Sequence, residues 1–321
     1  MPATAYGNFH DFCRDSGDRH STLPICNLFN ESPSRLGNAA GFGGCDLTGI
    51  PLSGGRRLAN LGSIIVDGIA ILTMLYLLWR SNRKRAAVGR REMQIFLLSY
   101  IIISICEIFT IGGFPLDGAV RRVSEIVGTI PSHVSDAFTG FHSSAHRSNH
   151  RIRLDSHDER RSRLSATGRR YTLSLALVFG SAAILFIGTG YIALDTGFSW
   201  TGYWNSTLDA PNKAYALYTL YQLVPMIFLV VFFLLETVLV LRVLGERRPM
   251  LYLIAAALLF IIGQIFQYVI SVHLCTSTNG AINGGLFETL FTFLSVVMIW
   301  AFWSSITEDD WPMPPTTDTY D

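Results

Sequence analysis

Residues 61–79 read LGSIIVDGIAILTMLYLLW, and the basic stretch RSNRKRAAVGRRE follows directly at residues 80–92. The first stretch is apolar almost throughout, and a helix needs about 20 such residues to cross the hydrocarbon core of a bilayer. The helix is the required form because lipid offers no hydrogen-bond partners to exposed backbone groups. Together the two stretches predict a transmembrane helix that ends in a charged loop.

The composition of the whole chain agrees with a membrane protein. Its 321 residues are 50% hydrophobic and 15% charged, with a mean hydropathy of +0.35, whereas soluble domains carry about 25% charged residues. The net charge is +1, so no overall electrostatic field favours nucleic acid as a partner. The bilayer is therefore the expected surroundings of most of the chain.

Six apolar runs are long enough to cross a membrane. They are Leu61–Trp79, Ile95–Phe114, Tyr171–Leu194, Tyr215–Leu241, Leu251–Leu274 and Gly284–Trp303. Trp300 and Trp303 suit the headgroup level of a bilayer. The predicted fold class is an all-α membrane protein, a helical bundle of six clear transmembrane spans. Residues 1–58 are polar and contain no signal peptide, so the first span is expected to act as the targeting signal.

The orientation follows from short basic loops, which stay on the cytoplasmic side. The loops at residues 80–92 and 242–249 are both short and basic, and the first is the strongest such loop. They predict a luminal or outer N-terminus for residues 1–58 and a cytoplasmic C-terminus for the acidic tail at residues 306–321. An odd number of crossings must then lie between residues 114 and 171, so seven spans are expected from topology.

The extra span has no adequate apolar run. Gly118–Phe141 is the best candidate, but it contains Arg121, Arg122, Glu125 and Asp136, each of which is costly in lipid. The predicted organisation is a luminal region at 1–58, two spans at 59–114, an atypical polar and basic segment at 115–170, four spans at 171–305, and the tail.

Several blocks of the sequence resemble one protein family. The blocks are YGNFHDFC and LPICNLF near the N-terminus, AAVGRREMQIF, YQLVPMIFLVVFFLLETVLVLRVLGERRP, FIIGQIFQY, and GLFETLFTFLSVVMIWAFWSSITEDDW. In order and spacing they resemble the fungal chitin synthase export chaperones, whose members are endoplasmic reticulum membrane proteins that usually have seven spans. The resemblance implies a binding role in the folding and export of chitin synthase, with that membrane protein as client. The leading alternative is a small-molecule or lipid-translocating transporter.

Residues 115–170 depart from the family pattern, which has an apolar third span there. The stretch HSSAHRSNHRIRLDSHDERRSRLSATGRR at residues 142–170 holds four of the eight histidines. We interpret the segment as either a lineage-specific insert or an error in the assigned coding sequence. If it is genuine, it would be a solvated loop, a basic surface for anionic lipid headgroups, or a metal-binding histidine cluster.

The cysteines fit an oxidising compartment. Those predicted to face the lumen are Cys13, Cys26, Cys45 and Cys275, which allow two disulfides in three different pairings. Cys106 lies within a span and is expected to be inert packing. Glycosylation sequons start at Asn30 and Asn205, of which Asn30 is the better candidate because Asn205 lies in a short loop near the membrane.

Polar side chains inside the spans are functional candidates because each is costly in lipid. They are Asp67, Glu107, Glu236, Gln264, Gln267 and Glu288, together with His273 near the luminal end of its span. One interpretation is a proton or cation path. The other is hydrogen bonding between helices, at about 0.6 kcal/mol per contact, which would fix the packing of the bundle. No basic residue lies within the same apolar runs to pair with the carboxylates.

Enzymatic signatures are absent from the sequence, which has no P-loop, no HExxH and no nucleophile elbow. No catalytic residue, metal site or cofactor is predicted. A retinal receptor is excluded because it needs a lysine within a span, and Lys84 and Lys213 lie in loops. In the chaperone interpretation, Glu107, Gln264, Gln267 and Glu288 would contact polar groups of the client, and the acidic tail could engage vesicle-coat components.

Overall fold

The computed structural model of the protein describes residue 9 and residues 47–51, 57–84, 89–110, 187–195, 201, 203–204, 215–239, 241 and 247–307. Five helices in this part are long and apolar enough to cross a membrane, at Leu61–Arg83, Arg90–Thr110, Tyr215–Val238, Arg248–Ser277 and Gly284–Ile306. The predicted all-α membrane fold is confirmed, with five of the six apolar runs seen as membrane-length helices. Of the remaining run, residues 187–194 are helical; the rest of it and the expected seventh span lie outside the described residues.

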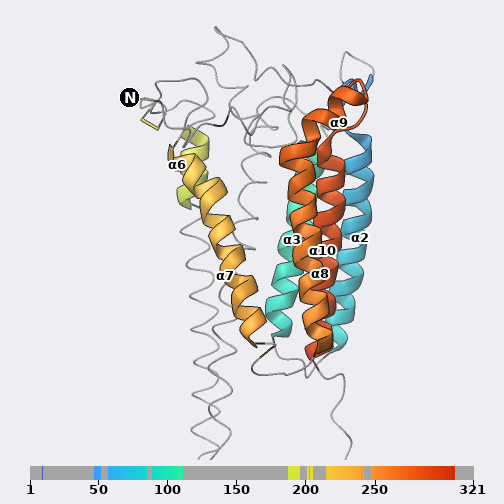
Figure 1. Ribbon diagram of the computed structural model, residues 1–321, viewed down its shortest axis with the longest axis vertical. Helices are drawn as coiled ribbons and strands as arrows, with labels where there is room; N and C mark the ends of the chain where they lie inside the picture. The colour runs from blue at the N-terminus through green and yellow to red at the C-terminus, as the bar shows by residue number, and fades with distance from the viewer. Residues whose placement is uncertain are drawn as a thin grey trace, which may run out of the picture.

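Four helices stand side by side as the main bundle (Figure 1). They are α2 (Leu61–Arg83), α3 (Arg90–Thr110), α8 (Arg247–Ile265) and α10 (Gly284–Ile306). Helix α10 is central, because it packs against both α8 and α2, and α2 packs in turn against α3. The chain reverses direction between α2 and α3, so the start of α2, the end of α3 and the start of α10 lie at the same end of the bundle.

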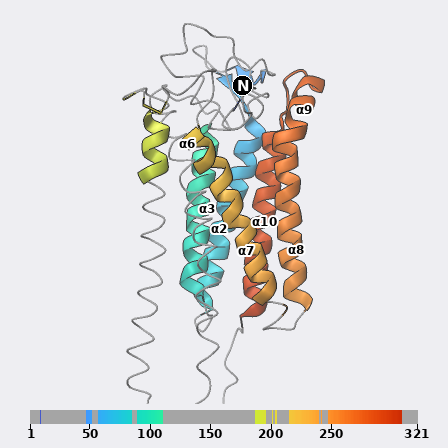
Figure 2. The same cartoon turned by 60° about the vertical axis from the view of Figure 1, so that its left-hand side comes forward.

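A second group of helices lies beside this bundle. It contains α6 (Tyr215–Tyr218), the π-helix η2 (Thr219–Leu223) and α7 (Val224–Leu239), which form one continuous element that contacts α8. Figure 2 shows the short helix at residues 187–195 standing apart from the four bundled helices. Helix α8 likewise continues through a π-helix, η4 (Phe266–Ile270), into α9 (Ser271–Ser277). Single π-helical turns within α-helices occur frequently at functional sites.

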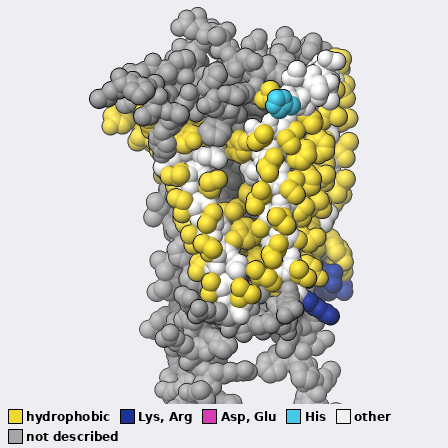
Figure 3. Space-filling model, in the orientation of Figure 1, with side chains coloured by type: hydrophobic (Ala, Val, Ile, Leu, Met, Phe, Trp, Pro, Cys, Tyr) yellow, Lys and Arg dark blue, Asp and Glu magenta, His cyan; other side chains and the backbone are white. Residues whose placement is uncertain are grey.

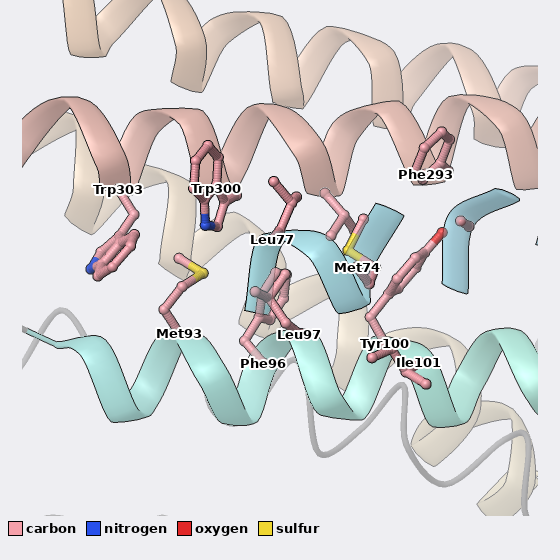
Figure 4. Close-up of a cluster of buried hydrophobic side chains, with 12 residues drawn as sticks. Met74, Leu77, Met93, Phe96, Leu97, Tyr100, Ile101, Phe293, Trp300 and Trp303 are labelled. Atoms are coloured by element: carbon pink, nitrogen blue, oxygen red, sulfur yellow. The ribbon is translucent and has the colours of Figure 1, made fainter. Parts of the chain in front are cut away.

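The bundle core is formed by interlocking side chains of α2, α3 and α10 (Figure 4). Met74 and Leu77 come from α2, whereas Leu97 comes from α3, and all three are at most 5% exposed. Trp300 and Trp303 of α10 are also buried in this cluster, at 7% and 2% exposed. These two rings therefore pack against neighbouring helices, and their depth relative to the headgroups stays a prediction.

One end of the bundle, which we call the Asn60 end, is closed by polar contacts. Asn60 precedes α2 and accepts a hydrogen bond from the Ser63 backbone amide at 3.2 Å. The side-chain amide of Asn60 also donates to the Asn283 side-chain oxygen at 3.0 Å. Beside them, the Gly284 amide donates to the Ser271 hydroxyl at 3.1 Å. The starts of α2 and α10 are thus tied together and to α9.

A short hairpin sits at the same end, where β1 (Ile50–Pro51) pairs with β2 (Arg57–Leu58) in an antiparallel manner. The segment just before it is held to the loop after α9, because the backbone amide and hydroxyl of Thr48 both donate to the Gly280 carbonyl, at 2.9 and 3.1 Å. Gly280 has a positive φ of 78°, a backbone conformation that glycine adopts without strain.

The opposite end, which we call the Lys84 end, is basic. The ammonium group of Lys84 donates to the Ser304 hydroxyl at 2.9 Å and to the Ser304 carbonyl at 3.2 Å. The guanidinium of Arg80 lies 5.2 Å from the Trp300 ring centroid. In the view of Figure 3, the basic side chains gather at this end, and apolar side chains cover the described helices above it. This distribution is typical of helices that cross a bilayer.

Candidate functional site

Three carboxyl side chains from three helices meet near the Asn60 end of the bundle. Asp67 lies on the second turn of α2, Glu107 on the last described turn of α3, and Glu288 on the second turn of α10. The antiparallel course of the helices places them at one depth, roughly 5–9 Å inside the helix ends at a rise of 1.5 Å per residue. We call Asp67, Glu107 and Glu288 the carboxyl cluster.

Within the carboxyl cluster, Asp67 is the innermost member, with 0% of its surface exposed. Its carboxyl faces that of Glu107, and Glu288 is close enough to act electrostatically on both. Glu288 accepts a hydrogen bond from the Thr292 hydroxyl at 3.1 Å. The Asp67 and Glu107 carboxyls are hydrogen-bonded to each other, and neither oxygen of Asp67 accepts from an amide or hydroxyl donor among the described residues. The site therefore offers carboxyl oxygens that no amide or hydroxyl of the described helices occupies.

Two hydroxyl groups extend the site along α3. Tyr100, Ser104 and Glu107 are spaced i, i+4 and i+7, which places them on one face of the helix. Tyr100 is 5% exposed and Ser104 is fully buried, and neither hydroxyl makes a hydrogen bond within the described part of the chain. The Tyr100 hydroxyl is within electrostatic reach of all three carboxyls. Figure 4 shows its ring rising from α3 toward Phe293 of α10.

The two π-helices border the same region. Tyr221 of η2 is within electrostatic reach of Glu288 and Glu107. The neighbouring Gln222 accepts a hydrogen bond from the Tyr268 hydroxyl of η4 at 3.0 Å. This bond joins the α6–α7 element to α8, so the segment beside the cluster has a defined position.

The other candidate residues lie on α7, on the α8–η4 segment and on α9. Glu236 is 3% exposed near the end of α7, which is the Lys84 end of the molecule, so the structure does not bring it to the carboxyl cluster. Gln264 is partly buried at the end of α8 and Gln267 is buried in η4. His273 is exposed on α9.

The chemistry open to the carboxyl cluster is limited by its spacing and its surroundings. Among the described residues, no group of three histidine, cysteine, aspartate or glutamate side chains is arranged to hold a metal ion. Each ionised carboxylate within a membrane span is costly. The cluster can therefore share protons or take up an organic cation that brings several N–H donors. The sequence predicted the three acidic residues of this site but not Tyr100 or Ser104. Their i+7 and i+3 spacing from Glu107, which places them on one face of the helix, could have identified them.

The cysteines are only partly described. Cys275 is buried at the end of α9 and is disulfide-bonded, whereas Cys106 is a buried free thiol. Cys13, Cys26 and Cys45 lie outside the described residues, as do both glycosylation candidates, Asn30 and Asn205. The pairing of the disulfides and the use of the sequons stay predictions.

The fold and the site define a multi-pass helical membrane protein with a polar cluster inside an otherwise apolar bundle. A sequence model of the chitin synthase export chaperone family matches residues 5–129 and 170–317. The chain belongs to that family. All five described membrane-length helices lie within the two matched ranges.

Curated relatives of the same name are similar over nearly the whole chain. A chitin synthase export chaperone of Coccidioides immitis is 24% identical over 313 residues, which cover 95% of this chain and 84% of the relative. One from Aspergillus fumigatus is 24% identical with the same coverage, and one from Chaetomium globosum is 23% identical over 95% of this chain and 83% of its own length. No solved structure matches.

The family match also bears on the segment between α3 and the next span. The prediction that the departure from the family begins at residue 115 is wrong, because the match continues through residue 129 and resumes at residue 170. Arg121 and Arg122 therefore belong to the matched part of the chain. Residues 130–169, with all four clustered histidines, lie between the two matched ranges.

Proposed function

We propose that this protein assists the folding of chitin synthase and its export from the endoplasmic reticulum, and that it acts by binding its client within the membrane. The observation that carries the proposal is the family match over residues 5–129 and 170–317, which includes every described span. A binding role requires no catalytic residue, and we propose that the protein is not an enzyme.

The proposed orientation puts the Asn60 end in the lumen and the Lys84 end in the cytoplasm. It is supported by the charge of the described helix ends, because Arg80, Arg83, Lys84, Arg90 and Arg91 all lie at the Lys84 end. Short basic loops stay cytoplasmic. In this orientation Cys13, Cys26, Cys45, Cys275 and Asn30 face the lumen, and the tail at residues 306–321 is available to vesicle-coat components.

The proposed mode of action is transient hydrogen bonding in lipid. Polar groups of an immature client span lack partners in hydrocarbon, and side chains such as Glu107, Gln264, Gln267 and Glu288 would supply them until the client completes its own contacts. Each such contact is worth about 0.6 kcal/mol. That magnitude suits a chaperone, since several contacts together retain a client and each is weak enough to release.

The test is a deletion strain with a fluorescent chitin synthase. Loss of this protein is expected to retain the synthase in the endoplasmic reticulum and to lower the chitin of the cell wall, and re-expression should restore both. A deletion strain with the synthase correctly placed would contradict the proposal and favour the transporter alternative. Association is tested in parallel by co-purification of the synthase from detergent-solubilised membranes.

A further inference from the structure

We propose that the carboxyl cluster, together with the Tyr100 hydroxyl, binds a lysine or arginine side chain carried by a membrane span of the client. This inference rests on the proposed function and specifies the ligand of its site. It begins from the separation of the three acidic side chains from basic groups. Asp67, Glu107 and Glu288 gather at one depth from three helices, and no ion pair of any of them occurs within the described residues.

The nearest basic residues on the same helices are too far away to neutralise the cluster. On α2, Asp67 and Arg80 are 13 residues apart, which is about 20 Å along a helix. On α3, Arg91 and Glu107 are 16 residues apart. All of these basic side chains lie at the Lys84 end. A cation that reaches the cluster must therefore come from outside the described helices.

The hydrogen-bonding groups of the cluster indicate which kind of cation it could bind. The Tyr100 hydroxyl is buried without a partner among the described residues, and no amide or hydroxyl of that part donates to the Asp67 carboxyl. An ammonium or guanidinium group presents three to five N–H donors, enough to contact more than one carboxylate and a hydroxyl oxygen at once. A metal ion would need ligands at about 2.0–2.6 Å on every side, and the described side chains are not so arranged.

The cost of an unpaired basic residue in lipid favours a membrane span as the carrier of the cation. Glu107 is partly exposed on α3. A client helix lying beside Glu107 could direct one basic side chain to its carboxyl group. A basic residue in a client span is costly in lipid until it is paired, so this is a group that an export chaperone would need to shield.

The test uses the full-length protein in phosphatidylcholine vesicles and a fluorescent Leu-rich transmembrane peptide as the probe. Three peptides are compared, which carry one Arg in the luminal third, one Arg in the cytoplasmic third, or none. We expect the luminal-Arg peptide to bind at least about ten-fold more tightly than the other two, a difference of about 1.4 kcal/mol. Equal binding of all three peptides, or of both Arg peptides, would overturn the inference.

Variants of the protein assign the effect to the cluster. The double substitution E107Q/E288Q keeps the size of both side chains and should abolish the preference for the luminal-Arg peptide, whereas E236Q at the other end of the molecule should leave it unchanged. Tyr100→Phe removes one hydroxyl and should weaken the binding of the luminal-Arg peptide by a few-fold, without a change in the binding of the other two peptides. An unchanged preference in E107Q/E288Q contradicts the inference, and so does an equal loss in E236Q.

Arg121 and Arg122 provide the competing explanation within the chain. If the preference for the luminal-Arg peptide appears only in the double variant R121Q/R122Q, the protein's own arginines neutralise the cluster and the inference fails.

The peptide experiment and the export experiment can fail independently of each other. If E107Q/E288Q shows no loss of peptide binding while the unmodified chain restores chitin synthase export, only the inference is wrong. If the unmodified chain does not restore export, the proposed function fails whatever the peptides do.

Discussion

The side-chain amide of Asn60 donates a hydrogen bond to the side-chain oxygen of Asn283 at 3.0 Å, across 223 positions of the sequence. Asn60 lies immediately before α2 and Asn283 immediately before α10, and both are at most 9% exposed. Because Asn60 also accepts the hydrogen bond of the Ser63 amide, one side chain caps a helix and joins it to the central helix of the bundle.

Replacing Asn60 by alanine should therefore remove two interactions. We expect Asn60→Ala to lower the free energy of unfolding by about 1–2 kcal/mol, because a lost N-cap costs about 1 kcal/mol and the buried amide of Asn283 loses its partner. Thermal unfolding in detergent micelles measures the change. Asn82→Ala is the matched control, since Asn82 accepts its hydrogen bond from Gln94 at an exposed site; it should change stability by less than about 0.5 kcal/mol. Similar losses in the two variants would argue against the joining role.

A second prediction compares two glycines. A Cβ at Gly284 would collide with the Phe266 carbonyl and come within 2.7 Å of the Ser271 Cβ, whereas a Cβ at Gly68 would meet nothing within 4 Å. Gly284→Ala should destabilise the protein by about 1–3 kcal/mol through overpacking. Gly68→Ala should be neutral or stabilising by about 0.5–1 kcal/mol, because alanine is the better helix former. Unfolding of both variants in micelles decides the matter, and a tolerated Gly284→Ala would show that α10 need not approach η4 so closely.

The third prediction concerns the disulfide of Cys275. The Gly280 amide donates to the Cys275 carbonyl at 2.8 Å, and Thr48 donates twice to the Gly280 carbonyl, so the chain three residues after Cys45 is held beside the Cys275 loop. We predict a Cys45–Cys275 bond, which leaves Cys13 and Cys26 to pair with each other. Mass spectrometry of unreduced proteolytic peptides should find the 45–275 crosslink. A crosslink from Cys275 to Cys13 or Cys26 contradicts the prediction, and Cys106→Ser, which changes a free thiol, serves as the control.

The fourth prediction tests the orientation. Asn30 should carry an N-linked glycan in microsomes, visible as a mobility shift that glycosidase treatment reverses and Asn30→Gln abolishes. A sequon appended to the C-terminus should stay unmodified, because the tail at residues 306–321 is predicted to be cytoplasmic. Modification of the appended sequon alone would invert the proposed topology.

The fifth prediction addresses the segment at residues 115–170. If its coding sequence is in error, transcripts should contain a different reading in this region with an apolar run of about 20 residues, enough to cross the bilayer. The segment as given places several charged residues where the seventh span is expected, which opposes insertion. Transcripts that agree with the given sequence, together with restored chitin synthase export by that version, would establish a genuine insert.

Hydropathy located the described spans well because a helix in lipid must be apolar over about 20 residues. The run Gly284–Trp303 became α10 at Gly284–Ile306, and Leu61–Trp79 became α2 at Leu61–Arg83. The helix at Arg90–Thr110 begins earlier than the predicted Ile95, because Arg90 and Arg91 sit in its first turn, where charged groups reach the aqueous side and cost little. The π-helices were not predictable, since one extra residue in a helical turn leaves no mark in hydropathy.

The site was predictable only as a set of separate residues. Depth and polarity identified Asp67, Glu107 and Glu288, but their meeting depends on the packing of α2, α3 and α10, which the hydrophobic pattern does not encode. Glu236 has the same chemistry and lies at the other end of the molecule. Tyr100 lies in an apolar run, where only its i, i+7 spacing from Glu107 connects it to an acid, and the structure adds its nearness to all three carboxyls and its buried hydroxyl.

The inward packing of Trp300 and Trp303 gives the protein a spectroscopic signal of its own assembly. With 7% and 2% exposed surface, these indoles are shielded from acyl chains, whereas Trp79 is 51% exposed on α2. Brominated lipids should quench the emission of Trp79 and spare that of the two α10 tryptophans. Any condition that separates α10 from α3 would make them accessible to the quencher, so bundle opening during client release could be followed by fluorescence without an attached dye.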